Sequence, residues 1–187
     1  MQGRSLVDSR HGLHALITST PLPDAETSDE YVKQDISTYS EGLKLADPSL
    51  LETRDEYEEQ TSNNIHTLFP STVIQQIHNT LAVRQVLPKS AGEFELIFHF
   101  FGYKDDDKEL RAMRLKQANL AGPAGYISME DTEATELVQR AITSCDDNAT
   151  SYIAMGREEN DQGTSLITEN MIRSFWRGYR DLMGWQS

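Results

Sequence analysis

The sequence predicts an α+β fold in which helices cover an antiparallel sheet, and two features of the chain support this prediction. Four runs rich in β-branched and aromatic residues follow one another between residues 64 and 103, with short turn segments between them. Segments on both sides of this block carry apolar residues at helical spacing. Strands grouped together and packed against helices are typical of an α+β domain.

Before the four central runs, the sequence predicts one strand and two helices. Leu13 to Ser19 form a short strand, which Pro21 and Pro23 end. A strongly acidic helix is predicted from Asp47 to about Glu58, because Asp47 suits an N-cap and Pro48 a first helical residue. An earlier helix, starting at Ser28, is indicated by apolar residues spaced by four, three and four positions: Val32, Ile36, Tyr39 and Leu43.

The four central runs predict an antiparallel meander. They are residues 64–69, 72–78, 81–87 and 93–103. In the last run, apolar residues at every second position make one face wholly apolar, and the other face becomes apolar towards the end. We therefore expect a sheet that is covered on both sides near that end.

The elements after the sheet are predicted to be mainly helical. Asp105 to Asp107 can cap a helix from Lys108 to about Leu120, which the segment Gly122 to Gly125 ends. A second helix is expected from Met129 to about Thr143, followed by a short strand at residues 150–155. The final helix is predicted from an aromatic-rich stripe at helical spacing: Ile172, Phe175, Trp176, Tyr179, Leu182 and Met183.

Composition limits the partners and the compartment. The chain has 187 residues, 37% of them hydrophobic, so we expect one globular unit. Its net charge of −13 opposes binding to nucleic acid or to an anionic membrane surface. No apolar stretch suits a membrane span and no signal peptide is evident, which favours a soluble cytoplasmic protein. The single cysteine, Cys145, excludes an internal disulfide and an iron–sulfur cluster within this chain.

The sequence lacks the local patterns of several common sites. The five histidines show no recognised metal-ligand spacing. His11 and His14 could share a metal only if they lay on one face, and a strand would place them on opposite faces. His66, His78 and His99 lie in predicted strands, where a structural role is the default and a place in the lining of a pocket is the alternative. Neither the Gly-x-Ser-x-Gly pattern of a serine hydrolase nor a glycine-rich nucleotide loop with lysine occurs. The acidic run from Glu56 to Glu59 is typical of a solvated helix face rather than a calcium site.

The segment from residue 122 to residue 133 joins a backbone turn to a group of carboxylates at a helix start. Ser128 and Asp131, three residues apart, have the form of a capping box, in which each side chain accepts a backbone N–H of the first turn. On spacing alone, this structural role is the favoured one for Asp131.

Three longer segments resemble the catalytic domain of Rieske non-heme iron ring-hydroxylating oxygenase large (α) subunits. Residues 122–139, GPAGYISMEDTEATELVQ, are similar to the turn and helix that carry the iron's carboxylate ligand in that family. Residues 63–103 resemble its sheet. Residues 167–184 resemble the C-terminal helix of the branch acting on salicylate, anthranilate and related aromatic carboxylates. The resemblance implies a helix-grip-like catalytic domain, here incomplete.

The resemblance implies that Asp131, the second acid of the pair Glu130-Asp131, is an iron ligand. A facial triad of two histidines and one carboxylate leaves three iron positions for O₂ and substrate activation. The family's Asp-x-x-His-x4-His pattern is missing, as are the cysteine and histidine pairs of the Rieske domain. We therefore expect residues 1–187 to be a C-terminal fragment of the catalytic domain, without the Rieske domain and inactive alone.

The resemblance also implies a substrate pocket lined by the sheet and by the turn before Asp131. Asn63, Ile65 and Gln75 on the sheet and Ile127 near the ligand are the candidates by position. Gln75 could donate two hydrogen bonds to a carboxylate or hydroxyl group, and Arg84 could bind a carboxylate through two parallel bonds. Alternatively, Gln75 and Arg84 face solvent.

The predicted function is O₂- and NAD(P)H-dependent hydroxylation of an aromatic carboxylate such as salicylate, anthranilate or a substituted benzoate. The resemblance implies a mononuclear Fe(II), a 2Fe-2S Rieske cluster in the missing domain, and electrons from NAD(P)H through a ferredoxin or reductase. It also implies a small β subunit and other α subunits as partners. The missing histidines and cysteines support an alternative: a non-catalytic helix-over-sheet module that binds an apolar ligand.

Overall fold

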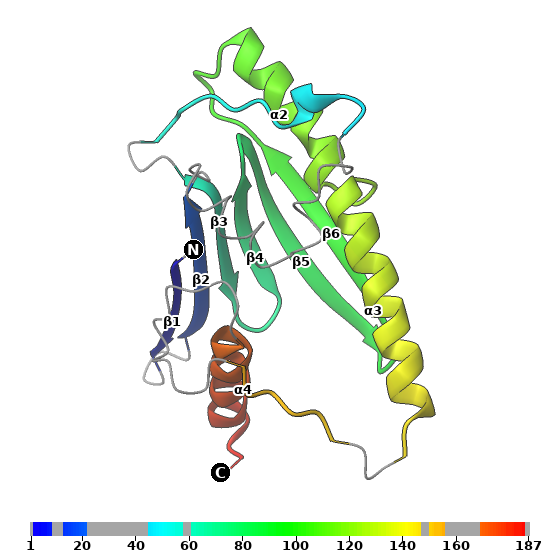
Figure 1. Ribbon diagram of the computed structural model, residues 1–187. Helices are drawn as coiled ribbons and strands as arrows, with labels where there is room; N and C mark the ends of the chain where they lie inside the picture. Colours follow the sequence, from blue (N-terminus) through cyan, green and yellow to red (C-terminus); the bar gives the residue numbers. More distant parts are fainter. Residues whose placement is uncertain are drawn as a thin grey trace.

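The core of the molecule is an antiparallel sheet whose strands lie side by side in sequence order (Figure 1). The computed structural model describes residues 2–8, 13–21, 45–57, 61–146, 150–155 and 169–185. The sheet has six strands: β1 (Gln2–Asp8), β2 (Leu13–Pro21), β3 (Thr61–Leu68), β4 (Thr72–Ile77), β5 (Thr80–Ser90) and β6 (Glu93–Phe101). The four central runs therefore form the predicted meander, and the α+β class is confirmed.

The described residues form three α-helices next to the sheet (Figure 1). Helix α2 (Lys108–Ala121) packs on β5 at one end of the strands, and α4 (Asn170–Met183) packs near β1 and β2 at the opposite end. Helix α3 (Tyr126–Ser144) follows α2 and is drawn along β6 in the view of Figure 1. A 3₁₀ turn, η2 (Pro48–Leu50), packs against α2. Among the helices of the described ranges, none combines the length and the apolarity that a membrane span requires.

The strand register divides the sheet into two faces, because residues directly opposite each other on neighbouring strands point to the same side. We call one of them the inner face. Its members on β3 to β6 include Asn63, Ile65, Gln75, Ile77, Thr80, Ala82, Arg84, Phe98 and Phe100. A β-carbon on Gly122, between α2 and α3, would lie 3.3 Å from the Phe100 ring. The connection between these helices therefore crosses the inner face.

The predicted acidic helix from Asp47 to Glu58 is wrong. Only the turn Pro48–Leu50 is helical, with Asp47 as its N-cap, and residues 52–56 have no regular secondary structure. The Asn79 side chain accepts a bond from the Arg54 N–H (2.9 Å) and donates one to the Arg54 carbonyl (2.6 Å). These bonds replace the helical ones at that residue. The helix predicted from Ser28 to Leu43 lies outside the described residues.

Two further predictions about elements differ from the structure. The predicted strand at residues 150–155 is not formed, because this segment turns back to the start of α4: the Met155 N–H donates to the Glu169 carboxylate (2.8 Å), and the Glu169 N–H donates to the Met155 carbonyl (3.0 Å). β1, which pairs with β2, was not predicted. Helix α3 begins at Tyr126 rather than at Met129.

The face that α4 buries is not the predicted aromatic stripe. Its buried residues are Asn170, Ser174 and Gly178, each four positions from the next. Such small side chains let a helix approach its neighbour closely, here β1 and β2. The aromatic residues lie beside this face: Phe175 and Tyr179 both pack on Phe69, with ring centroids 5.8 Å away. Aromatic spacing thus predicted the helix but not its buried face.

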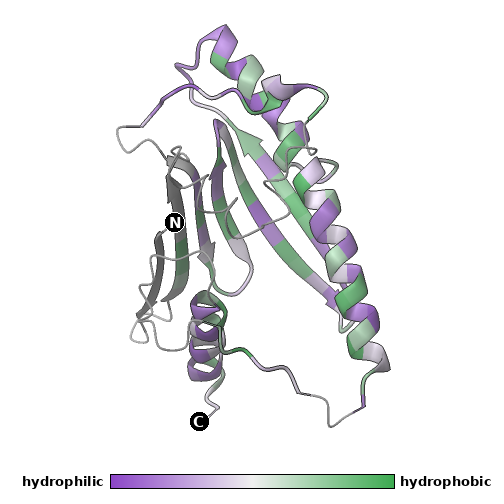
Figure 2. Ribbon diagram, in the orientation of Figure 1, coloured by the Kyte–Doolittle hydropathy of each residue, from purple (hydrophilic) through white to green (hydrophobic). Residues whose placement is uncertain are grey.

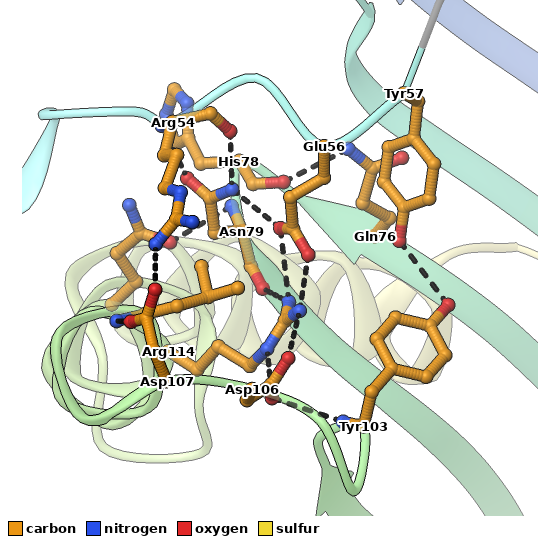
Figure 3. A network of polar contacts seen from close by, with 12 residues as sticks. Arg54, Glu56, Tyr57, Gln76, His78, Asn79, Tyr103, Asp106, Asp107 and Arg114 are labelled. Atoms are coloured by element: carbon orange, nitrogen blue, oxygen red, sulfur yellow. Dashed lines mark hydrogen bonds and ion pairs between the residues drawn. The ribbon is translucent and has the colours of Figure 1, made fainter.

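A buried arginine joins α2 to the sheet and to the segment that precedes β3 (Figure 3). The Arg114 side chain is 5% exposed, and its guanidinium binds two carboxylates, those of Asp106 and Glu56. The distances are 2.8 and 3.0 Å to Asp106 and 3.1 Å for one of the two bonds to Glu56, and a fifth bond goes to the Asn79 carbonyl. All five N–H donors of the guanidinium are therefore used.

The positive charge of Arg114 and the negative charge of Asp106 stabilise each other. Burial alone would lower the pKa of Arg114, but hydrogen bonds and charges from Asp106 and Glu56 outweigh it and raise that pKa. The bond from Arg114 also holds the pKa of Asp106 below its ordinary value. The ion pairs are thus fully formed near neutral pH.

Two polar side chains extend the contacts around Arg114. Gln117, 1% exposed, accepts a bond from the Asn79 N–H (2.9 Å) and donates one to the Glu52 carbonyl (2.7 Å). The Thr80 hydroxyl donates to the Arg114 carbonyl (3.1 Å). We call this set, with Arg114, Glu56, Asp106 and Asn79, the Arg114 network. It binds together the segment before β3, the turn between β4 and β5, the loop after β6, and α2.

We predict that Arg114→Met lowers the free energy of unfolding by about 3–5 kcal/mol, because it leaves two buried carboxylates without their partner. Urea denaturation near neutral pH measures this loss. Arg111→Met is the matched control on the same helix, since Arg111 is exposed, and it should change stability by no more than about 0.5 kcal/mol. Equal effects of the two substitutions would contradict the account of the network.

Candidate functional site

The inner face carries polar atoms that are buried but unpaired. Gln75 is 2% exposed, yet neither its amide nitrogen nor its amide oxygen finds a hydrogen-bond partner among the described residues. The same holds for Oδ1 of Asn63 and Nε of Arg84. A buried amide without a partner costs about 1–3 kcal/mol, so such atoms usually serve a ligand or a bound water molecule.

Four of the residues predicted to line a pocket share this face. The register places Ile65 opposite Gln75, and Asn63 two positions from Ile65 on the same strand. Arg84 lies two positions from Ala82, which is opposite Gln75. The structure therefore brings all four residues together on one side of the sheet. The prediction that they line a substrate pocket stays a prediction.

Arg84 is held over the inner face by an aromatic neighbour and lies within the electrostatic field of α3. Its guanidinium carbon is 5.8 Å from the centre of the Phe98 ring. Burial lowers the pKa of Arg84, and the negative charge of Asp131 acts in the opposite direction. The negative charge of Asp131 on α3 therefore reaches Arg84 on the inner face.

Helix α3 carries Asp131 and Ile127 in its first two turns. Asp131 is exposed, and Ile127 is 38% exposed. The capping box expected for Ser128 and Asp131 is absent, because the N-cap is Gly125 and both residues lie inside the helix. Asp131 therefore has no capping role, and its carboxylate is available for other contacts.

Most of α3 is uncovered within the described part of the chain. None of its residues is buried, and Figure 2 shows hydrophobic residues recurring along its length. The large apolar side chains exposed on it are Tyr126, Ile127, Met129, Leu137, Val138 and Ile142. On β6, Phe94 and Phe100 are also exposed, at 57% and 38%. The described residues therefore leave apolar side chains of both α3 and β6 uncovered.

The described histidines do not complete a metal site with Asp131. His66 and His99 lie on the face of the sheet opposite to Gln75 and Arg84. His78 lies in the turn between β4 and β5, not in a strand as predicted, with φ of 52°. Across the described ranges, no three side chains of histidine, cysteine, aspartate or glutamate gather closely enough to hold a metal ion. The carboxylate of Asp131 is therefore a candidate metal ligand without a complete set of further ligands among the described residues.

A hollow lies next to the Arg114 network. It has a volume of about 200 Å³ and lies between α2 and the adjoining ends of β5 and β6, with Thr80, Phe100 and Leu115 in its walls. None of the predicted pocket residues lines it. We therefore place the candidate site on the inner face, where buried polar atoms lack partners.

The antiparallel sheet, the turn from Gly122 to Gly125 and the helix that carries Asp131 are the features to compare with known families. Residues 18–185 match the family model of the ring hydroxylating α subunit, catalytic domain. Because the match covers most of the chain, this protein belongs to the family of ring-hydroxylating oxygenase α-subunit catalytic domains.

Particular relatives fall within the same family. The chain is 57% identical over 185 residues to the anthranilate 1,2-dioxygenase large subunit of Burkholderia cepacia, covering 99% of this chain and 43% of that protein. It is 42% identical over 183 residues to the terephthalate 1,2-dioxygenase terminal oxygenase component subunit alpha 2 of Comamonas sp, covering 98% and 44%.

A third relative is less similar in sequence, and its name gives a different activity. The large oxygenase component of salicylate 5-hydroxylase from Ralstonia sp is 34% identical over 172 residues, covering 91% of this chain and 40% of that protein. The chain thus spans less than half the length of each of these relatives.

Sequence reasoning missed the contacts of the Arg114 network. Arg114 and Arg111 lie on the same helix, and nothing in their local sequence separates a buried residue from an exposed one. The carboxylate partners of Arg114 lie 8 and 58 residues away along the chain. Only the run of aspartates at 105–107 signalled part of this region: it predicted the N-cap, and Asp107 accepts the Leu110 N–H (2.8 Å).

We predict that Gln75→Leu raises the free energy of unfolding of the unliganded chain by about 1 kcal/mol, because it removes a buried amide without a partner. Gln76→Leu is the matched control on the opposite face. The Gln76 amide accepts a bond from Asn64 (2.7 Å) and donates one to the His78 carbonyl (2.9 Å), so this change should lower stability. Thermal unfolding of both variants tests the contrast, and similar losses in the two would contradict it.

Proposed function

We propose that this chain forms part of the mononuclear-iron catalytic domain of a ring-hydroxylating oxygenase that acts on an aromatic carboxylate. Asp131 supplies the carboxylate ligand of the iron, and the inner face binds the substrate. One observation carries the proposal: the buried amide of Gln75 and Nε of Arg84 share one face of the sheet and have no hydrogen-bond partner among the described residues, and the charge of Asp131 on α3 acts on Arg84.

The described residues supply one of the three protein ligands of such an iron site, the carboxylate of Asp131. A lone carboxylate does not hold Fe(II) in a defined geometry, whereas two histidines and a carboxylate do so and leave positions open for O₂ and substrate activation. Asp131 is exposed and lies inside α3 rather than at its N-cap, so its carboxylate can take a metal ion. The remaining donors belong to the part of the relatives' length that this chain does not span. The chain alone is therefore expected to be inactive.

Arg84 and Gln75 suit the recognition of a carboxylate. A guanidinium offers two parallel N–H bonds to a planar carboxylate, and an amide can add a third bond or accept one from a ring hydroxyl or amine. The neighbouring Phe98 and Ile65 provide apolar surface for an aromatic ring. The names of the relatives refer to anthranilate, terephthalate and salicylate, each of which has an aromatic ring with at least one carboxylate.

The other components of the reaction follow from the family. We propose that a 2Fe-2S Rieske cluster outside this chain passes electrons that come from NAD(P)H through a ferredoxin or reductase, in a cytoplasmic assembly with a small β subunit and other α subunits. The name of the Comamonas relative, a terminal oxygenase component, refers to such a multicomponent system. In this scheme the present residues bind and orient the substrate and hold one side of the iron.

We predict that Asp131→Asn in the full-length subunit lowers bound mononuclear iron by at least about tenfold and abolishes turnover, because a neutral amide is a weak ligand for Fe(II). Iron is measured by elemental analysis together with the Rieske cluster content, which should not change. Glu130→Gln is the matched control, being the adjacent acid on the same helix, and should keep its iron. Normal iron and turnover in Asp131→Asn would overturn the proposal and favour a ligand-binding module.

A further inference from the structure

The position of Asp131 depends on α2. Among the described elements, α2 is the only one against which α3 packs extensively, and α3 itself buries no residue. The two helices are joined by a turn of four residues, Gly122 to Gly125. The orientation of α3, and with it that of Asp131, is therefore set by this turn and by the way in which α2 sits on the sheet.

The turn is too tight to act as a free hinge. The Gly122 N–H donates to the Ala118 carbonyl (2.7 Å), and the Gly125 N–H donates to the Gly122 carbonyl (2.8 Å). A β-carbon on Gly122 would lie 2.4 Å from the Ala118 oxygen, and one on Gly125 would lie 2.5 Å from the Leu120 oxygen. Backbone packing of this kind transmits the placement of α2 directly to α3.

The placement of α2 is in turn dominated by the Arg114 network. Five of its residues are buried: Leu110, Arg114, Gln117, Leu120 and Ala121. Two of these five are polar, and both bind partners on other segments, so they fix direction as well as distance. Apolar contacts tolerate sliding, whereas a guanidinium bound to two carboxylates in two parallel pairs admits one orientation. The Arg114 cation also lies 5.4 Å from the centre of the Tyr103 ring.

We propose that Arg114, with Glu56 and Asp106, is a positioning group for the site: it locks α2 on the sheet and thereby fixes the position of α3, and of Asp131 on it, relative to the sheet. The network touches neither substrate nor iron, and it acts through the α2–α3 turn. The role of Asp131 rests on the proposed function, but the positioning of α3 does not.

The single cysteine of the chain provides an attachment site for a spin label with which to test this proposal. Cys145 is exposed and lies at the C-terminal end of α3. A second spin label, introduced by Ser71→Cys in the turn between β3 and β4, reports the distance from the sheet to α3 by pulsed electron paramagnetic resonance. A control pair within the sheet uses Ser71→Cys and Glu93→Cys in a Cys145→Ser background.

In labelled chains that keep the Arg114 network intact, we expect a narrow distance distribution for both label pairs. Arg114→Met should broaden and shift the distribution between residues 71 and 145 while leaving that between 71 and 93 unchanged. Arg111→Met, which removes an exposed charge from the same helix, should leave both unchanged. Arg114→Lys should give an intermediate width, since an ammonium cannot bind two carboxylates in parallel pairs.

An unchanged distribution between residues 71 and 145 in Arg114→Met, with the sheet intact, would overturn the proposal. If Arg114→Met disrupts the sheet itself, Glu56→Gln decides, because it keeps the shape of the side chain and removes one charge. The distance from the sheet to α3 must then change in Glu56→Gln, and an unchanged distance overturns the proposal. Iron loading of Asp131 plays no part in this measurement, so its outcome is independent of the proposed function.

Discussion

The pairing of Arg114 with two carboxylates is the interaction on which the rest of the arrangement depends. The sheet is a meander in which each strand is hydrogen-bonded to its neighbour in sequence order, and short turns join β3 to β6. The helices have no such framework: α3 is exposed along its length, and α2 buries only five residues. Burying a cation and two anions is stabilising only when every donor is satisfied, as it is here. The network therefore gives α2 a single position at the end of the sheet.

The stability that the Arg114 network contributes can offset the cost of unpaired polar atoms at the candidate site. The inner face holds Gln75, Asn63 and Arg84 with buried polar atoms unpaired, an arrangement that lowers the stability of the unliganded chain. A fold can carry such groups only where other contacts offset their cost. The two regions differ: the polar groups around Arg114 are hydrogen-bonded within the chain, whereas the Gln75 amide, Oδ1 of Asn63 and Nε of Arg84 have no hydrogen-bond partner among the described residues. This difference supports the proposal that the inner face, rather than the region around Arg114, binds a ligand.

Sequence reasoning predicted the regular elements better than the connections between them. The four central strands and α2 follow from periodicity and from caps such as Asp107, because these signals are local. The segment from Asp47 to Glu58 looked helical, but its polar groups bind Asn79 and Arg114, which no local pattern reveals. The residues of the inner face were singled out by resemblance and are grouped by register. The buried face of α4 was missed because small residues pack closely there.

The most direct test of the central claim is a crystal structure of the full-length subunit with an aromatic carboxylate such as anthranilate bound. The account predicts a carboxylate within hydrogen-bonding distance of Arg84 and Gln75, with the ring on the inner face and directed towards Asp131. A substrate bound elsewhere, or one that leaves both the Arg84 guanidinium and the Gln75 amide without contact, would contradict it.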